Sequence, residues 1–190
     1  DLLTRKTVYS GSKGKEHIDQ VFSDYSNDGE GNKPKTLDVY SYDGKNLSKT
    51  SSYDISETST LDENNLITET LFEGEKGNEH ATQLFRYQDG KMTEREDYSY
   101  DSYSSAYAAG GKGFSRRQTL TFDVSGLSTE DAKRRSSGEL TFDDLGQITG
   151  DFTGTLVSQE LFTGSAGHEK PDQKFSYEEE NGLYTLSERT

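Results

Sequence analysis

The sequence predicts an all-β protein in which about 12–14 short strands form one antiparallel up-and-down meander. Three features lead to this prediction. No window repeats apolar residues with the period of a helix, turn signals made of Asp or Asn and Gly recur, and one glycine-rich segment occurs three times. So many strands must twist, so we expect one strongly curved sheet, either open or closed into a barrel. The 190 residues are expected to form a single repetitive domain, 1–190.

The glycine-rich segment spans residues 9–25, 72–87 and 162–177, and a shorter fourth copy begins at Gly110. Each full copy carries an aromatic residue, two glycines three residues apart, a glutamate, a glutamine and two further aromatic residues. In the second copy these are Phe72, Gly74, Gly77, Glu79, Gln83, Phe85 and Tyr87. We interpret every copy as a strand end, a glycine loop, and a second strand whose side chains alternate between two faces.

From the N-terminus, the sequence predicts two strands, a polar connection and a third strand, at residues 2–10, 19–25, 27–34 and 35–42. The third strand alternates Leu37 and Val39 on one face with Asp38, Tyr40 and Tyr42 on the other.

A second repeat marks hairpin tips. It consists of an aromatic residue or Leu, an acidic residue, a short Gly or Asn turn, and an aliphatic residue. Its six copies begin at Tyr42, Leu61, Tyr87, Phe122, Phe142 and Tyr177. The Asp43-Gly44 turn of the first copy is the strongest hairpin signal in the chain. Residues 128–136 are the best candidate for a helix, although Ala132 is the only apolar residue in that window.

The composition indicates a folded protein with a thin core. Leu, Ile, Val and Phe make up 34 of 190 residues and the net charge is −14, values that are also typical of disordered chains. Against disorder, the apolar residues are regularly spaced, and 12 Tyr and 9 Phe are more aromatic residues than a disordered acidic chain usually carries. We therefore expect a sheet with many water-facing positions, stabilised largely by cross-strand pairs.

Charge and cysteine content limit the partners and the chemistry of the chain. The chain has no cysteine, and no apolar run approaches the ~18 residues of a membrane span. It begins at Asp1, so we expect a trimmed fragment of an extracellular or cell-surface protein whose export signal or N-terminal membrane anchor has been removed. The acidic balance disfavours nucleic acid and favours a basic protein partner.

Two hairpin tips carry a resemblance to a known repeat. The stretch from Phe142 to Ile148 reads FDDLGQI and that from Phe122 to Leu127 reads FDVSGL. They resemble YD repeats, the β-hairpin repeats of Rhs and teneurin shells, with Phe in place of Tyr. In size, acidity, sheet content and lost anchor, the chain is also similar in character to TipC-type immunity proteins. That resemblance implies a small extracellular protein that blocks a secreted bacterial toxin.

No metal or cofactor site is expected. His17, His80 and His168 each lie beside a glutamate in a glycine loop, and we interpret them as solvated loop tips rather than metal ligands. Residues 24–29 resemble the start of a calcium loop, but Lys35 occupies the twelfth position, where a bidentate Glu is required. The GxxG loops lack the Lys-Ser/Thr ending and the helix of a phosphate-binding loop.

The candidate contact site is an acidic, tyrosine-rich segment, with Tyr98, Tyr100, Tyr103, Tyr107, Asp97 and Asp101 as its residues. It can be interpreted as an exposed binding loop or as a strand edge with a mobile tip. No nucleophile motif appears, so we expect no enzyme. The sequence favours an extracellular binding protein that presents an acidic curved sheet face to a basic protein, such as a cognate toxin. The alternative is a structural or adhesive surface module that binds glycan through the tyrosines.

Overall fold

The computed structural model describes residues 4–27, 32–58, 60–101, 114–136, 141–142, 148–149, 152–181 and 183–190. Contacts divide the chain into two compact units, which are described separately here. Unit 1 holds residues 1–79 and 86–91, and unit 2 holds residues 80–85 and 92–190.

The described residues form an all-β fold with one short α-helix and one 3-10 turn. The strands are β1 (Arg5–Ser10), β2 (His17–Ser23), β3 (Ser26–Asn27), β4 (Asn32–Lys33), β5 (Thr36–Asp43), β6 (Asn46–Asp54), β7 (Leu66–Glu73), β8 (His80–Gln88), β9 (Lys91–Tyr100), β10 (Arg116–Asp123), β11 (Thr141–Phe142), β12 (Ile148–Thr149), β13 (Thr155–Thr163), β14 (Lys170–Glu180) and β15 (Leu183–Arg189). The 3-10 turn η1 spans Glu63–Asn65 and the helix α1 spans Thr129–Ala132.

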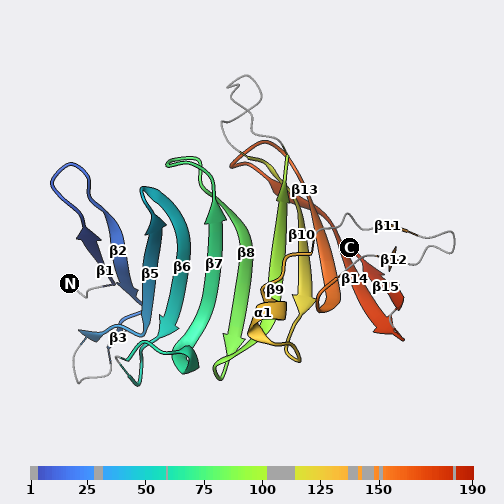
Figure 1. The fold of residues 1–190 in the computed structure, drawn as a ribbon, viewed down its shortest axis with the longest axis horizontal. Coiled ribbons are helices and arrows are strands. Elements are labelled where there is room, and N and C mark those ends of the chain that lie inside the picture. Colours follow the sequence, from blue (N-terminus) through green and yellow to red (C-terminus); the bar gives the residue numbers. More distant parts are fainter. Residues whose placement is uncertain are drawn as a thin grey trace. The chain divides into compact units, whose positions relative to one another are not determined.

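Strand order confirms the predicted antiparallel meander. The main sheet has 13 strands in the order β1-β2-β5-β6-β7-β8-β9-β10-β13-β14-β15-β12-β11, and β3 pairs with β4 alone. Most neighbours in this order are also consecutive along the chain (Figure 1). Strands β1 and β11 end the order, and within the described ranges they do not pair with each other. The sheet is therefore open, and the alternative of a closed barrel is wrong.

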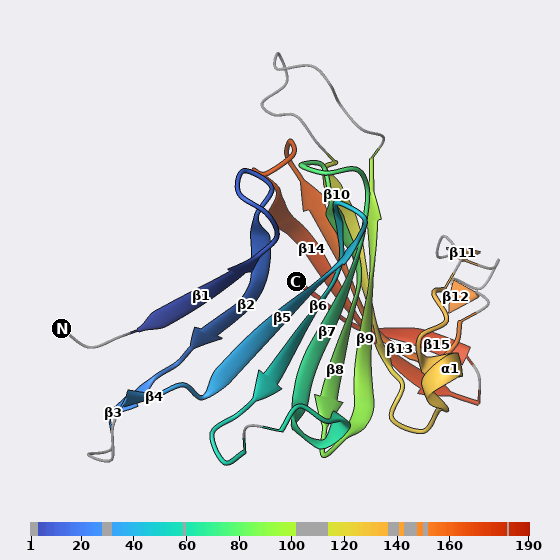
Figure 2. The same ribbon diagram turned by 60° about the vertical axis from the view of Figure 1, so that its left-hand side comes forward.

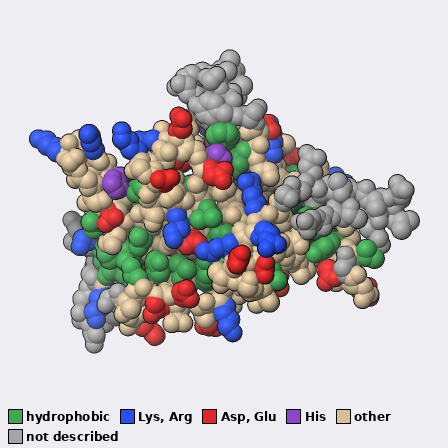
Figure 3. Space-filling view, in the orientation of Figure 1, with side chains coloured by type: hydrophobic (Ala, Val, Ile, Leu, Met, Phe, Trp, Pro, Cys, Tyr) green, Lys and Arg blue, Asp and Glu red, His purple; other side chains and the backbone are tan. Residues whose placement is uncertain are grey.

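In unit 1, opposed residues on paired strands show which side chains share a face. Leu37 opposes Phe22 on one side and Tyr53 on the other, so one face carries an apolar row. Asp38 lies on the opposite face and accepts a hydrogen bond from the Ser52 hydroxyl, directly across the pair. Figure 3 shows hydrophobic side chains gathered over β5 to β7 on the face in view.

Unit 1 has a thin core, as the composition indicates. Among its described residues, the buried ones are Val21, Leu37, Ser51 and Glu69. The carboxylate of Glu69 is compensated by Lys49, whose Nζ lies 3.1 Å from Glu69 Oε2. The register shifts by one residue between Ser41 and Tyr42, and the extra residue, Ser48, belongs to β6, so the bulge does not interrupt the alternation predicted for β5.

The larger core belongs to unit 2. Leu120 opposes Asp97 and Gln159, and Phe122 opposes Arg95 and Leu156, so these side chains share one face, called here the core face. All six are buried, and Arg95, Phe122 and Leu156 are fully enclosed. Helix α1 lies over this sheet (Figures 1 and 2) and contributes the buried Ala132. The helix falls inside the window that the sequence marked as the best helical candidate.

Several predicted hairpins are confirmed. Strands β5 and β6 meet at Gly44, which has a φ of 62°. Asp89 and Gly90 both have positive φ, 50° and 72°, as a two-residue type I′ turn requires. Phe142 opposes Ile148, whereas the tip between them lies outside the described residues.

The expected hairpin tip at Phe122 to Leu127 is wrong. Asp123 instead forms a local turn in which its Oδ1 accepts hydrogen bonds from the backbone N–H and hydroxyl of Ser125. The chain then enters α1, and the next neighbour of β10 in the sheet is β13. Asp and Gly mark the turn correctly, but they do not determine which strand pairs next. No helix among the described residues has the length and apolar character needed to cross a membrane.

Candidate functional site

The three glycine loops share one backbone geometry. The first glycine of each has a φ between 104° and 117°, and a Cβ there would lie 2.6–2.8 Å from the carbonyl oxygen four residues later. These glycines are Gly11, Gly74 and Gly164. Each loop also contains a hydrogen bond of 2.8 Å closing a turn, from the N–H of Lys15, Asn78 or His168 to the carbonyl three residues earlier. Only glycine fits the first position, which explains the repeat physically.

The repeated glutamate stabilises the first two of these loops. Glu16 Oε2 accepts a hydrogen bond of 2.7 Å from the N–H of Gly14, and Glu79 Oε2 accepts one of 2.6 Å from that of Gly77. Glu79 Oε1 also accepts from the N–H of Leu47 at 3.3 Å, which ties its loop to β6. Partial burial acts to raise the pKa of Glu79, but the backbone N–H donors and nearby Lys76 outweigh it and lower the pKa overall.

Two of the histidines take part in the same aromatic arrangement. His17 contacts the Tyr42 ring at a centroid distance of 4.4 Å, and the Tyr42 hydroxyl donates to the carbonyl of Ile18 at 2.9 Å. In unit 2, His80 contacts Tyr100 at 4.8 Å, and the Tyr100 hydroxyl donates to the carbonyl of the residue after His80 at 2.7 Å. The tyrosines thus hold the strands that follow the loops.

None of these histidines belongs to a metal-ligand cluster within the described ranges, where no three His, Asp or Glu side chains are grouped to hold an ion. In the segment that resembled a calcium loop, Asp24 accepts a hydrogen bond of 2.9 Å from the Thr36 hydroxyl. Asp28 and Gly29 of that segment lie outside the described residues.

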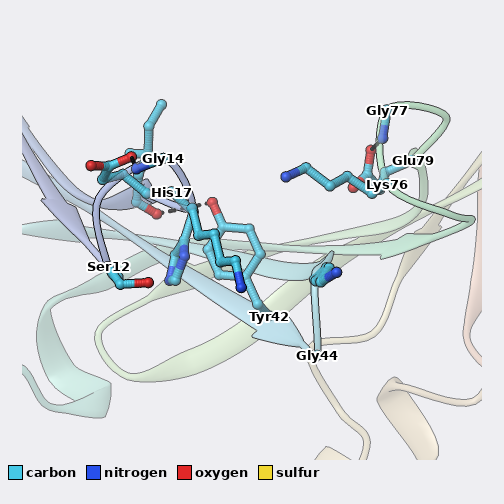
Figure 4. A pocket seen from close by; sticks show the side chains of 13 residues that line it. Ser12, Gly14, His17, Tyr42, Gly44, Lys76, Gly77 and Glu79 are labelled. Carbon is cyan, nitrogen blue, oxygen red and sulfur yellow. Dashed lines mark hydrogen bonds between the residues drawn. The ribbon is translucent and has the colours of Figure 1, made fainter.

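A cavity of about 760 Å³, called here the loop cavity, lies at the hairpin tips of unit 1. It is lined by the β1–β2 loop, the β5–β6 turn and the loop after β7 (Figure 4). His17 and Tyr42 lie on one side of it, and Lys76 extends toward them from the opposite loop (Figure 4). Lys15 and Lys45 also line the cavity, so each of the three turns contributes a lysine.

The tyrosine-rich site predicted from the sequence is only partly described. Tyr103 and Tyr107 lie outside the described residues, Tyr100 is half-buried, and Asp101 is exposed and ion-paired with Arg117. Tyr98 was expected on an exposed loop or at a strand edge. It instead lies within β9 in the interior of the sheet and is 6% exposed, because the Arg116 guanidinium covers its ring at 4.3 Å. Asp97 is also buried, as the ion-pair partner of Arg95.

Sequence reasoning missed Arg95, the most enclosed polar residue in the described part of the chain. Its Nη1 donates to the carbonyls of Ala132 and Arg134 at 3.0 and 2.7 Å, and its Nη2 donates to Ser136 Oγ at 2.8 Å. Its guanidinium also lies 4.4 Å from the centre of the Phe122 ring. Arg95 thereby attaches the α1 segment to the sheet. The sequence does contain a signal for this ion pair, because Arg95 and Asp97 are two residues apart. That spacing places their opposite charges on the same face of a strand.

The face of unit 2 opposite to the core face carries several carboxylates. Opposed residues form three rows across the strands: Glu96, Thr121, Ser158, Ser176 and Glu188; Tyr98, Thr119, Glu160 and Lys174; and Glu94, Asp123 and Thr155. We call this surface the carboxylate face, because five of its residues are acidic and only Lys174 in these rows is basic. Its acidic residues are Glu94, Glu96, Asp123, Glu160 and Glu188, all half-buried or exposed.

The sequence matches no protein-family model and no curated protein. Among solved structures, the chain is similar to a protein of unknown function from Bacteroides fragilis NCTC 9343, with 11% sequence identity. The match covers 98% of this chain and 91% of that chain, with a TM-score of 0.28.

Proposed function

We propose that this protein is a non-catalytic binding protein that engages a basic protein partner through the carboxylate face of unit 2. The observation that carries the proposal is the separation of side chains between two faces of one sheet. Arg95, Phe122 and Leu156 lie with α1 on the core face, whereas five carboxylates from four strands lie on the opposite face.

The chemistry of the carboxylate face suits a surface rich in Lys and Arg. Glu160 opposes Thr119 and Lys174, and Glu188 opposes Ser176, so carboxylates and hydroxyls lie next to one another across the strands. Lys and Arg donate charge-assisted hydrogen bonds to carboxylates and ordinary ones to hydroxyls. The net charge of −14 adds attraction at a distance, which accelerates the encounter of oppositely charged proteins.

The proposed setting is outside the cytoplasm, with a secreted toxin as the cognate partner and inhibition of that toxin as the outcome. The support for this finer proposal is the acidic balance and the lack of cysteine. An inhibitor needs a complementary surface and no reaction chemistry, which agrees with a sheet face as the functional element.

The test uses the 190-residue chain as bait for the secreted proteins of its source strain, washed at low salt. The expected result is one basic protein whose association rate falls at least about tenfold between low and high ionic strength. The double variant Glu160→Lys and Glu188→Lys should weaken capture strongly. Its matched control, Glu57→Lys and Glu75→Lys, reverses two exposed carboxylates of unit 1 and should bind as the parent does.

Three results would contradict the proposal: no basic protein is captured, the captured protein associates equally fast at all salt concentrations, or both double variants lose it equally. Toxicity of the captured protein, relieved by this chain, would support the inhibitor role. Capture without any effect on that protein's activity would reject inhibition and leave binding intact.

A further inference from the structure

The loop cavity of unit 1 has a charge character opposite to that of the protein as a whole. Its lysines, Lys15, Lys45 and Lys76, come from three separate turns, and His17 adds an imidazole. Figure 3 shows Lys or Arg side chains with a histidine near the tip of the β1–β2 hairpin. We propose that the loop cavity binds the phosphate group of a phosphate ester, whether a free molecule or a lipid headgroup.

The two carboxylates that line the cavity are already engaged by the backbone. Glu16 accepts from the Gly14 N–H, and Glu79 accepts from the N–H groups of Gly77 and Leu47. No ion pair connects Lys15, Lys45 or Lys76 to another residue that the structure describes. The ammonium groups therefore keep their donors for a ligand, and Glu16 and Glu79 serve mainly to hold the loops in place.

The walls of the cavity are held by contacts that do not need a ligand. The N–H of Lys76 donates to the side-chain oxygen of Asn46 at 3.0 Å, which joins the loop after β7 to the start of β6. Ser10 Oγ lies 3.0 Å from His17 Nε2 within the first hairpin, and the Tyr42 hydroxyl bonds to the carbonyl of Ile18. The three turns that carry the lysines are thus positioned before binding, which lowers the entropy lost on association.

Lysine chemistry favours phosphate over a planar carboxylate. Lys acts as a mobile point charge with three donors, which suits the several oxygens of a phosphate, whereas two-point recognition of a carboxylate generally uses Arg. The rings of His17 and Tyr42 on one side offer an apolar surface for the organic part of the ligand. The net charge of −14 does not prevent this, because charges more than ~8 Å away are largely screened at physiological salt.

The first experiment is an NMR titration of the 15N-labelled chain with inorganic phosphate, against chloride at the same ionic strength. Phosphate should shift the amide signals of Gly14, Lys45 and Gly77, and chloride should not. The triple variant Lys15→Gln, Lys45→Gln and Lys76→Gln should weaken this binding at least about tenfold, because each exposed charge contact contributes a few-fold. The control Lys91→Gln removes an exposed lysine from the start of β9 and should leave binding unchanged.

A second experiment identifies the source of the phosphate. Sedimentation with phosphatidylglycerol vesicles, against phosphatidylcholine vesicles, should deplete the chain only if the lipid headgroup is the ligand, and the triple variant should abolish the effect. Phosphate binding without vesicle binding assigns a soluble ester. The proposal is overturned if neither probe binds, or if the triple variant binds both as the parent does. All residues changed in these experiments lie in unit 1, whereas the carboxylate face lies in unit 2. A failure of phosphate binding therefore does not bear on the proposed basic partner, and a failure to capture a basic partner does not bear on the loop cavity.

Discussion

Arg95 Nε lies 3.2 Å from Oδ2 of Asp97, which is two residues further along the same strand. This ion pair is buried, because the side chain of Arg95 is 0% exposed and that of Asp97 is 5% exposed. Burial lowers the pKa of Arg95, while the Asp97 carboxylate opposes that shift and keeps the guanidinium charged. Asp97 in turn accepts hydrogen bonds from Gln83 Nε2 at 2.8 Å and from the Ser136 N–H at 3.1 Å. The pair thus joins β8, β9 and the segment after α1.

Replacement of Arg95 should therefore be severe. In Arg95→Met, Asp97 is left as an uncompensated buried charge and the α1 segment loses three hydrogen bonds, so we expect the free energy of unfolding to fall by about 3–5 kcal/mol. Urea denaturation measures this. Arg117→Met removes the half-exposed partner of Asp101 and should leave the denaturation midpoint unchanged. A similar small effect for both variants would contradict a structural role for Arg95.

The double variant Arg95→Met with Asp97→Leu gives a sharper test of the pair. Since no unpaired charge remains in the core, it should recover part of the stability that Arg95→Met loses. If the two substitutions were simply additive in urea denaturation, the ion pair would not be the cause of the loss.

Alanine at the first loop glycine should destabilise the fold. In Gly74→Ala, the new Cβ would lie 2.6 Å from the Asn78 carbonyl oxygen at a φ of 113°, so we expect a loss of about 1–3 kcal/mol in the free energy of unfolding. Gly126→Ala is the matched control, because a Cβ there meets nothing within 4 Å. Its unfolding free energy should stay within about 0.5 kcal/mol of the parent. Equal losses would show that loop geometry is not the reason for the glycine repeat.

Removing the Glu79 carboxylate should loosen its loop. An amide in Glu79→Gln offers one acceptor oxygen in place of two, so the N–H groups of Gly77 and Leu47 cannot both keep their bonds. Hydrogen exchange of these two amides should accelerate by NMR, whereas Glu75→Gln, an exposed residue of the same loop, should change neither. Since the folded pKa of Glu79 is lowered, its stabilisation is present above the ordinary Glu pKa of about 4.3 and is lost as pH falls below it.

Tyr98 should make the fold sensitive to alkali. Burial, and then the hydrogen bond from its hydroxyl to Glu96 Oε2 at 2.7 Å, raise the pKa of Tyr98. Since the folded state holds this proton more tightly than the unfolded state, the contribution is complete below the ordinary Tyr pKa of about 10 and is lost as pH rises above it. Urea denaturation from pH 8 to 11 should show falling stability in the parent and a shallower fall in Tyr98→Phe. Parallel curves would assign the alkaline loss to other groups.

The sequence by itself determined the local structure of this protein. Gly11, Gly74 and Gly164 mark the loops because no other residue fits their backbone, and Asp89-Gly90 marks a turn because both positions need positive φ. These are short-range requirements, so they can be read from neighbouring residues. The antiparallel meander follows from many such turns in series.

Only the tertiary structure decided which side chains are buried and which meet. Tyr98 and Asp97 were expected in an exposed binding loop or at a strand edge, yet both lie within the paired strand β9. Asp97 is buried on the core face, where it bonds to the segment after α1, and Tyr98 is buried on the carboxylate face under the Arg116 guanidinium. The lysines of the loop cavity are about 30 residues apart in sequence and come together through strand pairing alone. Strand partners are set by long-range contacts, whose energies depend on the whole sheet and cannot be read from local patterns.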